Sequence, residues 1–472
     1  MIAERGIAAL LALALAGCAA VPEDAGFEHA AELARERGGL ELAWRRGGDA
    51  EAALDRRVQE LLADELTLDD AVQVALLANR RLQALYTELG FAQADLLAAS
   101  RLPNPLLHAE LRFPDGGGRS ALDLGVEQSF LGLLLLPKKT RMAEDAFAAV
   151  ELRVAAGALT LAGETRAAYR RLQGAEQALA LKRAAHEAAD VACALAERLH
   201  AAGNLRDLDL DLERVQREEA RVAVADAELD ALEAREALVR ELGVYGPEAE
   251  LRIAAGLPEL PPPLEIGSEL EGRAIERSLD LAATRLLARR AERALGLEES
   301  TRYLSGLDLG VAAERESEGG WTTGPSLSLP LPLFSQGEAD LRRAAAELER
   351  LRADYYADAV ELRSRVRTGT ARVLALHARA SFLRDAVVPL RTRILEGLQL
   401  EYNAMQEGAF RLLAAKRAEL DASAAYVATL TDYWVASAAL DTLLEGAPAS
   451  GTLEAAALPT ALVSSSASPT AH

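Results

Sequence analysis

Side chains that could do chemistry are sparse in this 472-residue chain. It has two cysteines, and its histidines occur singly: they are His29, His108, His186, His200, His377 and His472. No histidine pair has metal-ligand spacing, and neither a glycine-rich phosphate loop nor a GxSxG nucleophile motif occurs. Carboxylates are so abundant that pairs at helical spacing arise by chance. We therefore expect no enzyme, with no catalytic residue, no metal site and no cofactor.

One cysteine lies where covalent modification is expected. Arg5 precedes an apolar run over residues 7–16, and the sequence Leu15-Ala16-Gly17-Cys18 completes it. A charged start, an apolar core and small residues before the cut are typical of a secretory signal peptide. The cysteine resembles that of a bacterial lipobox, so we expect residues 1–17 to be removed and Cys18 to carry lipid. Ala19 in place of aspartate favours the outer membrane. The alternative is an ordinary signal with a chance cysteine.

Composition narrows the class of protein further. The net charge of −21 argues against a nucleic-acid binder, which needs a basic face against phosphates. Half of the residues are hydrophobic, which excludes global disorder. Beyond the signal we find no run of 18 or more apolar residues, so no helical membrane span is expected. Any membrane crossing would then need a closed β-barrel.

Very long helices are the main predicted elements. No proline occurs from Lys138 to Ala202, which allows a helix of about 97 Å. Gly203-Asn204 then breaks the pattern, and Glu407-Gly408 makes the corresponding break later in the chain. Apolar residues seven apart predict supercoiled helical hairpins. They are Leu208, Val215, Val222 and Leu229 in the first hairpin, and Leu341, Leu348, Tyr355, Leu362, Gly369, Leu376, Leu383 and Leu390 in the second.

Four short segments alternate between apolar and polar residues with a period of two. Their first apolar residues are Leu107, Leu122, Leu307 and Leu327. Strands with one apolar and one polar side are what a transmembrane barrel needs. Four strands cannot close a barrel, so several chains would have to contribute. The alternative is two soluble hairpins packed on helices. Pro330 and Pro332 fit only an edge or a strand end.

The two halves of the chain repeat the same order of elements. The segment 75–84 is similar to 274–283, at an offset of 199 residues. Each of these two segments belongs to a predicted helix. The first helix runs from Asp69 to Leu102 with Thr67 as its N-cap, and the second runs from about Ser268 to Thr301. The expected divisions are a signal peptide 1–17, an N-terminal anchor and equatorial segment 18–65, a first repeat 66–255, a proline-rich linker 256–267, a second repeat 268–446 and a disordered tail 447–472.

Several segments together resemble the outer-membrane efflux proteins, the TolC-like channel-tunnels. They are Leu66-Thr67-Leu68-Asp69-Asp70-Ala71-Val72, Asn79-Arg80-Arg81-Leu82, Gly90-Phe91-Ala92-Gln93-Ala94-Asp95-Leu96, Leu102-Pro103-Asn104-Pro105, Gly324-Pro325-Ser326-Leu327-Ser328-Leu329-Pro330-Leu331-Pro332-Leu333-Phe334, Tyr402-Asn403-Ala404-Met405 and Asp432-Tyr433-Trp434. The resemblance covers about Ala31 to Gly446. It implies a mainly α fold with a small β part. Long antiparallel coiled-coil hairpins form a trimeric α-barrel, and four strands per chain contribute to a shared twelve-stranded transmembrane β-barrel. The low aromatic content and the leucine-rich run 131–136 depart from the pattern.

The resemblance also implies a function and partners. A homotrimer would serve as the passive exit duct for drugs or metal ions, joined through a periplasmic adaptor to an inner-membrane pump. The hairpin breaks would form the periplasmic tip, where Gly203, Leu205 and Gly408 are expected to contact the adaptor. Loops 114–118 and 316–320 would face outside.

Three carboxylates follow the first break and leave two interpretations open. Any of Asp207, Asp209 and Asp211 that points inward would be repeated in a trimer as an acidic ring. Alternatively, they are favourable acids at a helix N-terminus. For the whole chain, the remaining alternative is a lipid-anchored periplasmic coiled-coil scaffold or adaptor without a pore, which would not need two copies of a strand pair.

Overall fold

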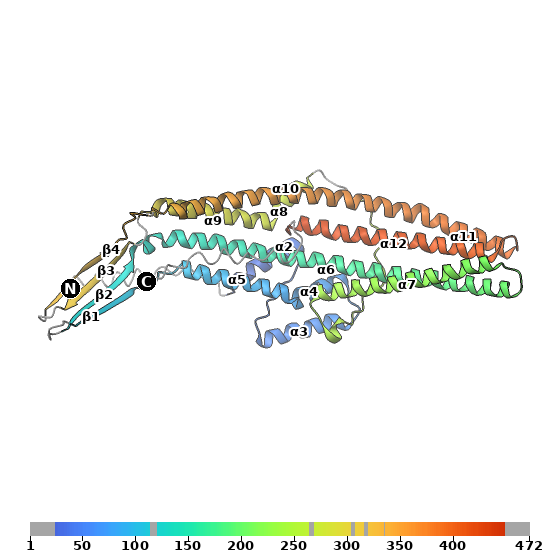
Figure 1. The fold of residues 1–472 in the computed structure, drawn as a ribbon, viewed down its shortest axis with the longest axis horizontal. Coiled ribbons are helices and arrows are strands. Elements are labelled where there is room, and N and C mark those ends of the chain that lie inside the picture. Colours follow the sequence, from blue (N-terminus) through green and yellow to red (C-terminus); the bar gives the residue numbers. More distant parts are fainter. Residues whose placement is uncertain are drawn as a thin grey trace.

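A computed structural model gives the fold over residues 24–113, 120–263, 269–303, 307–315, 320–334 and 336–448. The molecule is elongated, with a four-stranded sheet at one end and the tips of two helical hairpins at the other (Figure 1). The expected signal peptide with Cys18, the loop 114–118, most of the loop 316–320, part of the linker and almost all of the tail lie outside the described residues.

The internal repeat is visible in the order of elements. The helices α2 (Phe27–Gly38) and α3 (Gly48–Ala63) precede it. The first half contains α4 (Leu68–Ala78), α5 (Arg80–Ala99), β1 (Leu106–Arg112), β2 (Ala121–Ser129), α6 (Phe130–Ala201) and α7 (Asp207–Leu242), followed by a 3₁₀ turn at Gly246–Ala249. The second contains α8 (Leu270–Arg277), α9 (Leu279–Thr301), β3 (Asp308–Arg315), β4 (Trp321–Ser328), α10 (Glu338–Phe382), a π-helical turn (Leu383–Val387), α11 (Val388–Asn403) and α12 (Ala409–Glu445). Each half is therefore a helix pair, a strand pair and a long hairpin.

The expectation of one continuous helix at the start of each half is wrong. The first is interrupted at Asn79 and the second at Ser278, which are 199 residues apart like the repeated segments. The Asn79 side chain accepts hydrogen bonds from the backbone N–H groups of Arg81 and Leu82, and Ser278 accepts one from Leu281. Short polar side chains that cap a new helix in this way compete with continuation of the old one.

The long helix α6 starts earlier than the sequence indicates. It begins at Phe130 and contains Pro137, so the leucine-rich run 131–136 is the helix entry. One 18-residue window of α6 is apolar enough to pass for a membrane span by length and composition alone. Because 78% of that window is buried inside the chain, it fits a core helix.

The four strands form one antiparallel sheet in the order β1-β2-β3-β4. Leu107 pairs with Val126, which pairs with Val311, which pairs with Pro325. The predicted apolar face is therefore continuous across the sheet. The predicted last strand is shifted, because β4 spans Trp321–Ser328 and ends before Pro330 and Pro332, which cannot donate to a ladder.

The cores lie between helices, and the seam predicted along α7 is not part of them. Leu208, Val215, Val222 and Leu229 are 53–64% exposed in the single chain. The buried residues of α7 are Leu210, Ala227, Leu238, Val239 and Leu242. In the second hairpin the predicted Leu348 and Leu362 are buried as expected, whereas the predicted Leu390 is 52% exposed. Heptad spacing identifies an apolar face, but it does not identify the surface that covers that face.

Candidate functional site

The sheet carries mainly apolar side chains on one face and mainly polar side chains on the other. The apolar face carries Leu107, Ala109, Leu111, Leu122, Leu124, Val126, Leu309, Val311, Ala313, Pro325 and Leu327. The polar face carries His108, Glu110, Arg112, Asp123, Glu127, Asp308, Glu314, Thr322, Ser326 and Ser328. Leu107, Val311 and Leu327 are 62–69% exposed in the single chain. An apolar face of this kind requires lipid or another protein surface.

Carboxylates lie directly opposite each other on the polar face. Glu110 pairs with Asp123, and Asp123 pairs with Glu314 on the next strand. The Arg112 Nε donates to Glu110 Oε1 at 3.0 Å, and its Nη2 lies 3.6 Å from Asp123 Oδ2. His108 Nε2 lies 3.8 Å from Glu110 Oε2. The sequence reading treated His108 as isolated, although its position two residues before Glu110 on a strand places both on one face.

The first hairpin turn is held by short hydrogen bonds at the far end of the molecule. Gly203 has a φ of +76°, and its N–H donates to His200 O at 2.8 Å. The Asn204 N–H donates to Leu199 O at 2.8 Å. The left-handed backbone conformation at position 203 favours glycine over other residue types. Gly203 is exposed and Leu205 is half-buried, so the predicted contact residues lie at the surface of the tip.

The three aspartates after this turn differ in exposure, and each has a partner in its own chain. Asp207 Oδ1 lies 2.6 Å from His200 Nε2. Asp209 accepts two hydrogen bonds from the guanidinium of Arg206, and Asp211 accepts one from Arg214. Asp207 and Asp209 lie in the first turn of α7, where negative charge is favourable. These contacts agree with the helix N-terminus interpretation, and an inward acidic ring stays a prediction.

The second hairpin turn contains a feature that sequence reasoning missed. Met405 has a φ of +60° and a side chain that is 96% exposed. Its N–H donates to Tyr402 O at 2.9 Å, and Gln406 donates to Glu401 O at 2.9 Å. Gly408 has a φ of −85° and is the N-cap residue of α12. Met405 therefore has the left-handed conformation that Gly203 has in the first turn, and it presents an apolar side chain at the tip.

Polar contacts join the two hairpins near their tips. Arg417 of α12 donates to Gln216 of α7 at 2.5 Å and lies 3.9 Å from Glu213. Further from the tip, Lys182 of α6 lies 3.9 Å from Asp421. Figure 1 shows the ends of α7 and α11 at the same end of the molecule. The two turns therefore form one composite surface.

Burial raises the pKa values of the remaining thiol and of two carboxyl groups. Cys193 is buried in α6, and burial raises the pKa of its thiol, which is typical of an unreactive structural cysteine. Burial, reinforced by the nearby Glu241, raises the pKa of Glu164 to about 7, and the charge of Arg81 offsets part of this rise. The pKa of Glu241 is also raised, again chiefly by burial.

A twice-repeated unit of strand pair and long helical hairpin, with one apolar sheet face, defines a class of protein. It is the architecture of the trimeric channels that combine an α-barrel with a β-barrel, to which each chain contributes four strands. The fold class expected from the sequence is confirmed by solved structures with the same fold.

Comparisons with known proteins agree with this class. Residues 270–446 match the family described as outer membrane efflux protein. The cobalt-zinc-cadmium resistance protein CzcC of Cupriavidus metallidurans is 25% identical over 81% of this chain and 90% of its own. The Campylobacter jejuni CmeC outer membrane channel has a TM-score of 0.67 at 15% identity, covering 82% of this chain and 88% of that one. The Neisseria gonorrhoeae MtrE outer membrane channel has a TM-score of 0.63 at 18% identity, covering 80% and 89%.

The matched residues 270–446 make this chain similar to the outer membrane efflux proteins, which are a family of channels and not of enzymes.

Proposed function

We propose that this chain forms a homotrimeric outer-membrane exit duct for a tripartite efflux system. The observation that carries the proposal is the open sheet, with β1 and β4 at its edges and an exposed apolar face. An open sheet edge has unpaired backbone groups, which are costly in lipid. Three copies would join β1 of one sheet to β4 of the next and remove every edge.

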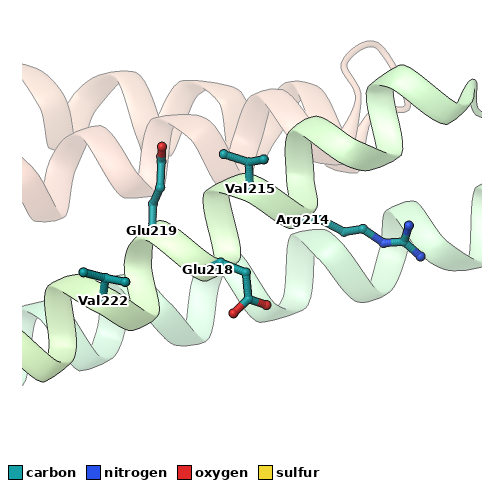
Figure 2. Close-up of a pocket in the computed structure, with 5 residues that line it drawn as sticks. All are labelled: Arg214, Val215, Glu218, Glu219 and Val222. Carbon is teal, nitrogen blue, oxygen red and sulfur yellow. The ribbon is translucent and has the colours of Figure 1, made fainter.

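The helical end supports the same assembly. α7 packs on α6, α6 packs on α12, and α12 packs on α11, so α7 and α11 end this series. Val215, Glu219 and Val222 point to the same side of α7 and line a shallow hollow (Figure 2). Exposed apolar side chains on α11 include Leu390, Ile394 and Leu400. In a trimer, the α7 face of one copy would cover the α11 face of the next.

The proposed cargo is a metal ion, carried passively. The relative CzcC is named for cobalt, zinc and cadmium resistance, which favours metal cations over drugs among the substrates that the sequence left open. The duct would provide a protected path, and the energy would come from an inner-membrane pump. The proposed site in the cell is the outer membrane of a Gram-negative bacterium, with lipid on Cys18 and helices in the periplasm.

The composite surface formed by the two hairpin turns is the proposed docking surface for a periplasmic adaptor. Gly203, Leu205 and Gly408 would contact the adaptor, and the exposed Met405 adds an apolar contact. Left-handed and glycine positions allow a partner to approach the backbone closely.

Two measurements on the detergent-extracted protein test the exit duct. We expect a trimer by light scattering corrected for detergent, and conductance when the trimer is added to a planar lipid bilayer. A monomer without conductance, released from membranes by removal of the lipid anchor alone, would contradict the proposal. It would favour the lipid-anchored scaffold without a pore.

A substitution at the tip tests docking separately. No described atom lies within 4 Å of a Cβ placed on Gly408, so Gly408→Trp should fold and form trimers. We expect affinity for the adaptor to fall by about tenfold or more, the size of effect seen at interface hot spots, with a matching loss of export. The control is Gly272→Trp, at an equally open position on α8. Unchanged export in Gly408→Trp would remove Gly408 from the docking surface.

A further inference from the structure

One histidine and two carboxylates converge on the polar face of the sheet. His108 and Glu110 lie two residues apart on β1, and Asp123 is the ladder partner of Glu110 on β2. A ring nitrogen of His108 and carboxylate oxygens of Glu110 and Asp123 all lie within 4.8 Å of one another. These three atoms are close enough for a single cation to contact them all after small side-chain rotations.

The charges around these residues favour a bound cation. Glu110, Asp123 and Glu314 are neighbours across three strands, and like charges directly opposite each other destabilise a sheet. Arg112 contacts Glu110 and Asp123, but a single guanidinium offsets one of the three negative charges. A divalent cation would neutralise the remaining two.

We propose that His108, Glu110 and Asp123 bind a divalent transition-metal cation such as zinc or cobalt, as a transient site on the exit path. The proposal rests on the proposed duct, because it assigns the polar face to the lumen. Imidazole nitrogen combined with carboxylate oxygen suits zinc and its neighbours, whereas magnesium and calcium prefer oxygen alone. Water would complete the coordination at these exposed side chains.

Two features make the site weak, as an exit path requires. His108 and Glu110 are exposed, and Asp123 is half-buried, so the ion stays in contact with water. Arg112 competes for the same carboxylates. Conduction needs binding that is favourable enough for entry and weak enough for release. In a trimer the site would occur three times at one level of the barrel.

Zinc titration of the full-length, detergent-solubilised protein tests the site. We would measure affinity by calorimetry with Zn²⁺ as the probe, in the wild type and in His108→Gln, Glu110→Gln and Asp123→Asn. Each substitution removes a ligand and should weaken binding by at least about tenfold, since even the loss of an outer-shell partner has effects of this size. Glu127→Gln is the matched control, because Glu127 lies on the same face of β2 as Asp123.

Arg112→Gln gives a test in the opposite direction. Removing the competing guanidinium should tighten zinc binding by about tenfold, the size expected for one unit charge close to a divalent ion in water. Weaker binding in Arg112→Gln would overturn the proposal. It would also be overturned if Glu127→Gln lost as much affinity as Glu110→Gln, since binding would then reflect general surface charge.

The failures of the two proposals are distinguishable. Bilayer conductance and trimer mass do not depend on His108. If wild-type trimers conduct but His108→Gln binds zinc as tightly as the wild type, the metal site fails and the duct stands. If the protein is a monomer without conductance, the duct fails, and with it the placing of this site on an exit path, whatever the zinc titration gives.

Discussion

Single glycines determine how closely α6 and α12 approach. A Cβ on Gly163 would clash with the side chain of Thr442, and one on Gly174 would clash with that of Thr431. Both threonines are β-branched, and their hydroxyls donate to the carbonyls of Ala438 and Val427, so they cannot rotate away without cost. The absent Cβ therefore sets the distance between the two halves of the repeat.

We expect Gly174→Ala to destabilise the protein by about 1–3 kcal/mol, the usual cost of overpacking a core. The readout is the free energy of unfolding in denaturant. The double variant Gly174→Ala with Thr431→Gly should recover part of the loss, because it removes the clashing atoms. Gly90→Ala is the control, at a helical position where a Cβ meets no described atom within 4 Å. Equal effects at Gly90 and Gly174 would contradict the packing argument.

The raised pKa of Glu164 predicts a pH-dependent stability. The pKa is about 7 in the folded chain against an ordinary value of 4.5, so the folded state holds more protons than the unfolded state between these values. Stability contributed by this group therefore falls as pH rises from about 4.5 to about 7. Glu164→Gln should raise the thermal midpoint above pH 7 and have little effect below pH 4.5. The exposed Glu36→Gln is the control, and a pH-independent difference for Glu164→Gln would contradict the burial argument.

At the scale of elements, the two halves of the repeat share a helix break at corresponding positions. Gly243 ends α7 beside Asn79, and Gly446 ends α12 beside Arg277, the residue before Ser278. Asn79 Nδ2 donates to Glu241 O at 2.8 Å, and Leu279 N–H donates to Gly446 O at 3.0 Å. Each break therefore joins a short helix to the end of a return helix.

The two caps should differ in their contribution to stability. The Asn79 side chain makes three hydrogen bonds and is 4% exposed, whereas Ser278 makes one, to Leu281 N at 3.3 Å. We expect Asn79→Ala to cost about 2 kcal/mol and Ser278→Ala about 1 kcal/mol or less, measured by chemical denaturation. Asn79→Asp keeps the cap acceptor and loses the donor, so it should fall between Asn79→Ala and the wild type. A larger loss for Ser278→Ala would contradict the role of the cap.

Some elements could be predicted from the sequence because their pattern has one physical meaning. The alternation of apolar and polar residues along β1 to β3 predicted the two faces of the sheet. Gly203 and Gly408 predicted the positions of the hairpin turns. The helix break at Asn79 was missed because the apolar pattern continues through it. The His108 cluster was missed because Asp123 reaches it through strand pairing. Met405 gave no signal, since left-handed backbone is unusual for its residue type.

At the scale of the whole molecule, the exposed stripe on α7 identifies the surface that assembly must cover. Leu208, Val215, Val222 and Leu229 recur every seven residues, as in a coiled-coil seam, yet all are more than half exposed in the single chain. Four such residues along one helix are expensive to leave in water. We propose that α11 of a second copy of the chain covers this stripe.

The double variant Val215→Glu with Val222→Glu tests that cover. Two carboxylates would be buried in the proposed seam, each at a cost of about 3–5 kcal/mol where no cation compensates it. We expect the mass in detergent to fall from trimer to monomer, while helix content by circular dichroism stays unchanged, because neither valine contributes to the buried core of its own chain. Arg221→Glu adds a glutamate to α7 away from the stripe and should leave the trimer intact. A trimer that survives the double variant would show that the β-strands alone hold the copies together, and the stripe would then need a different partner.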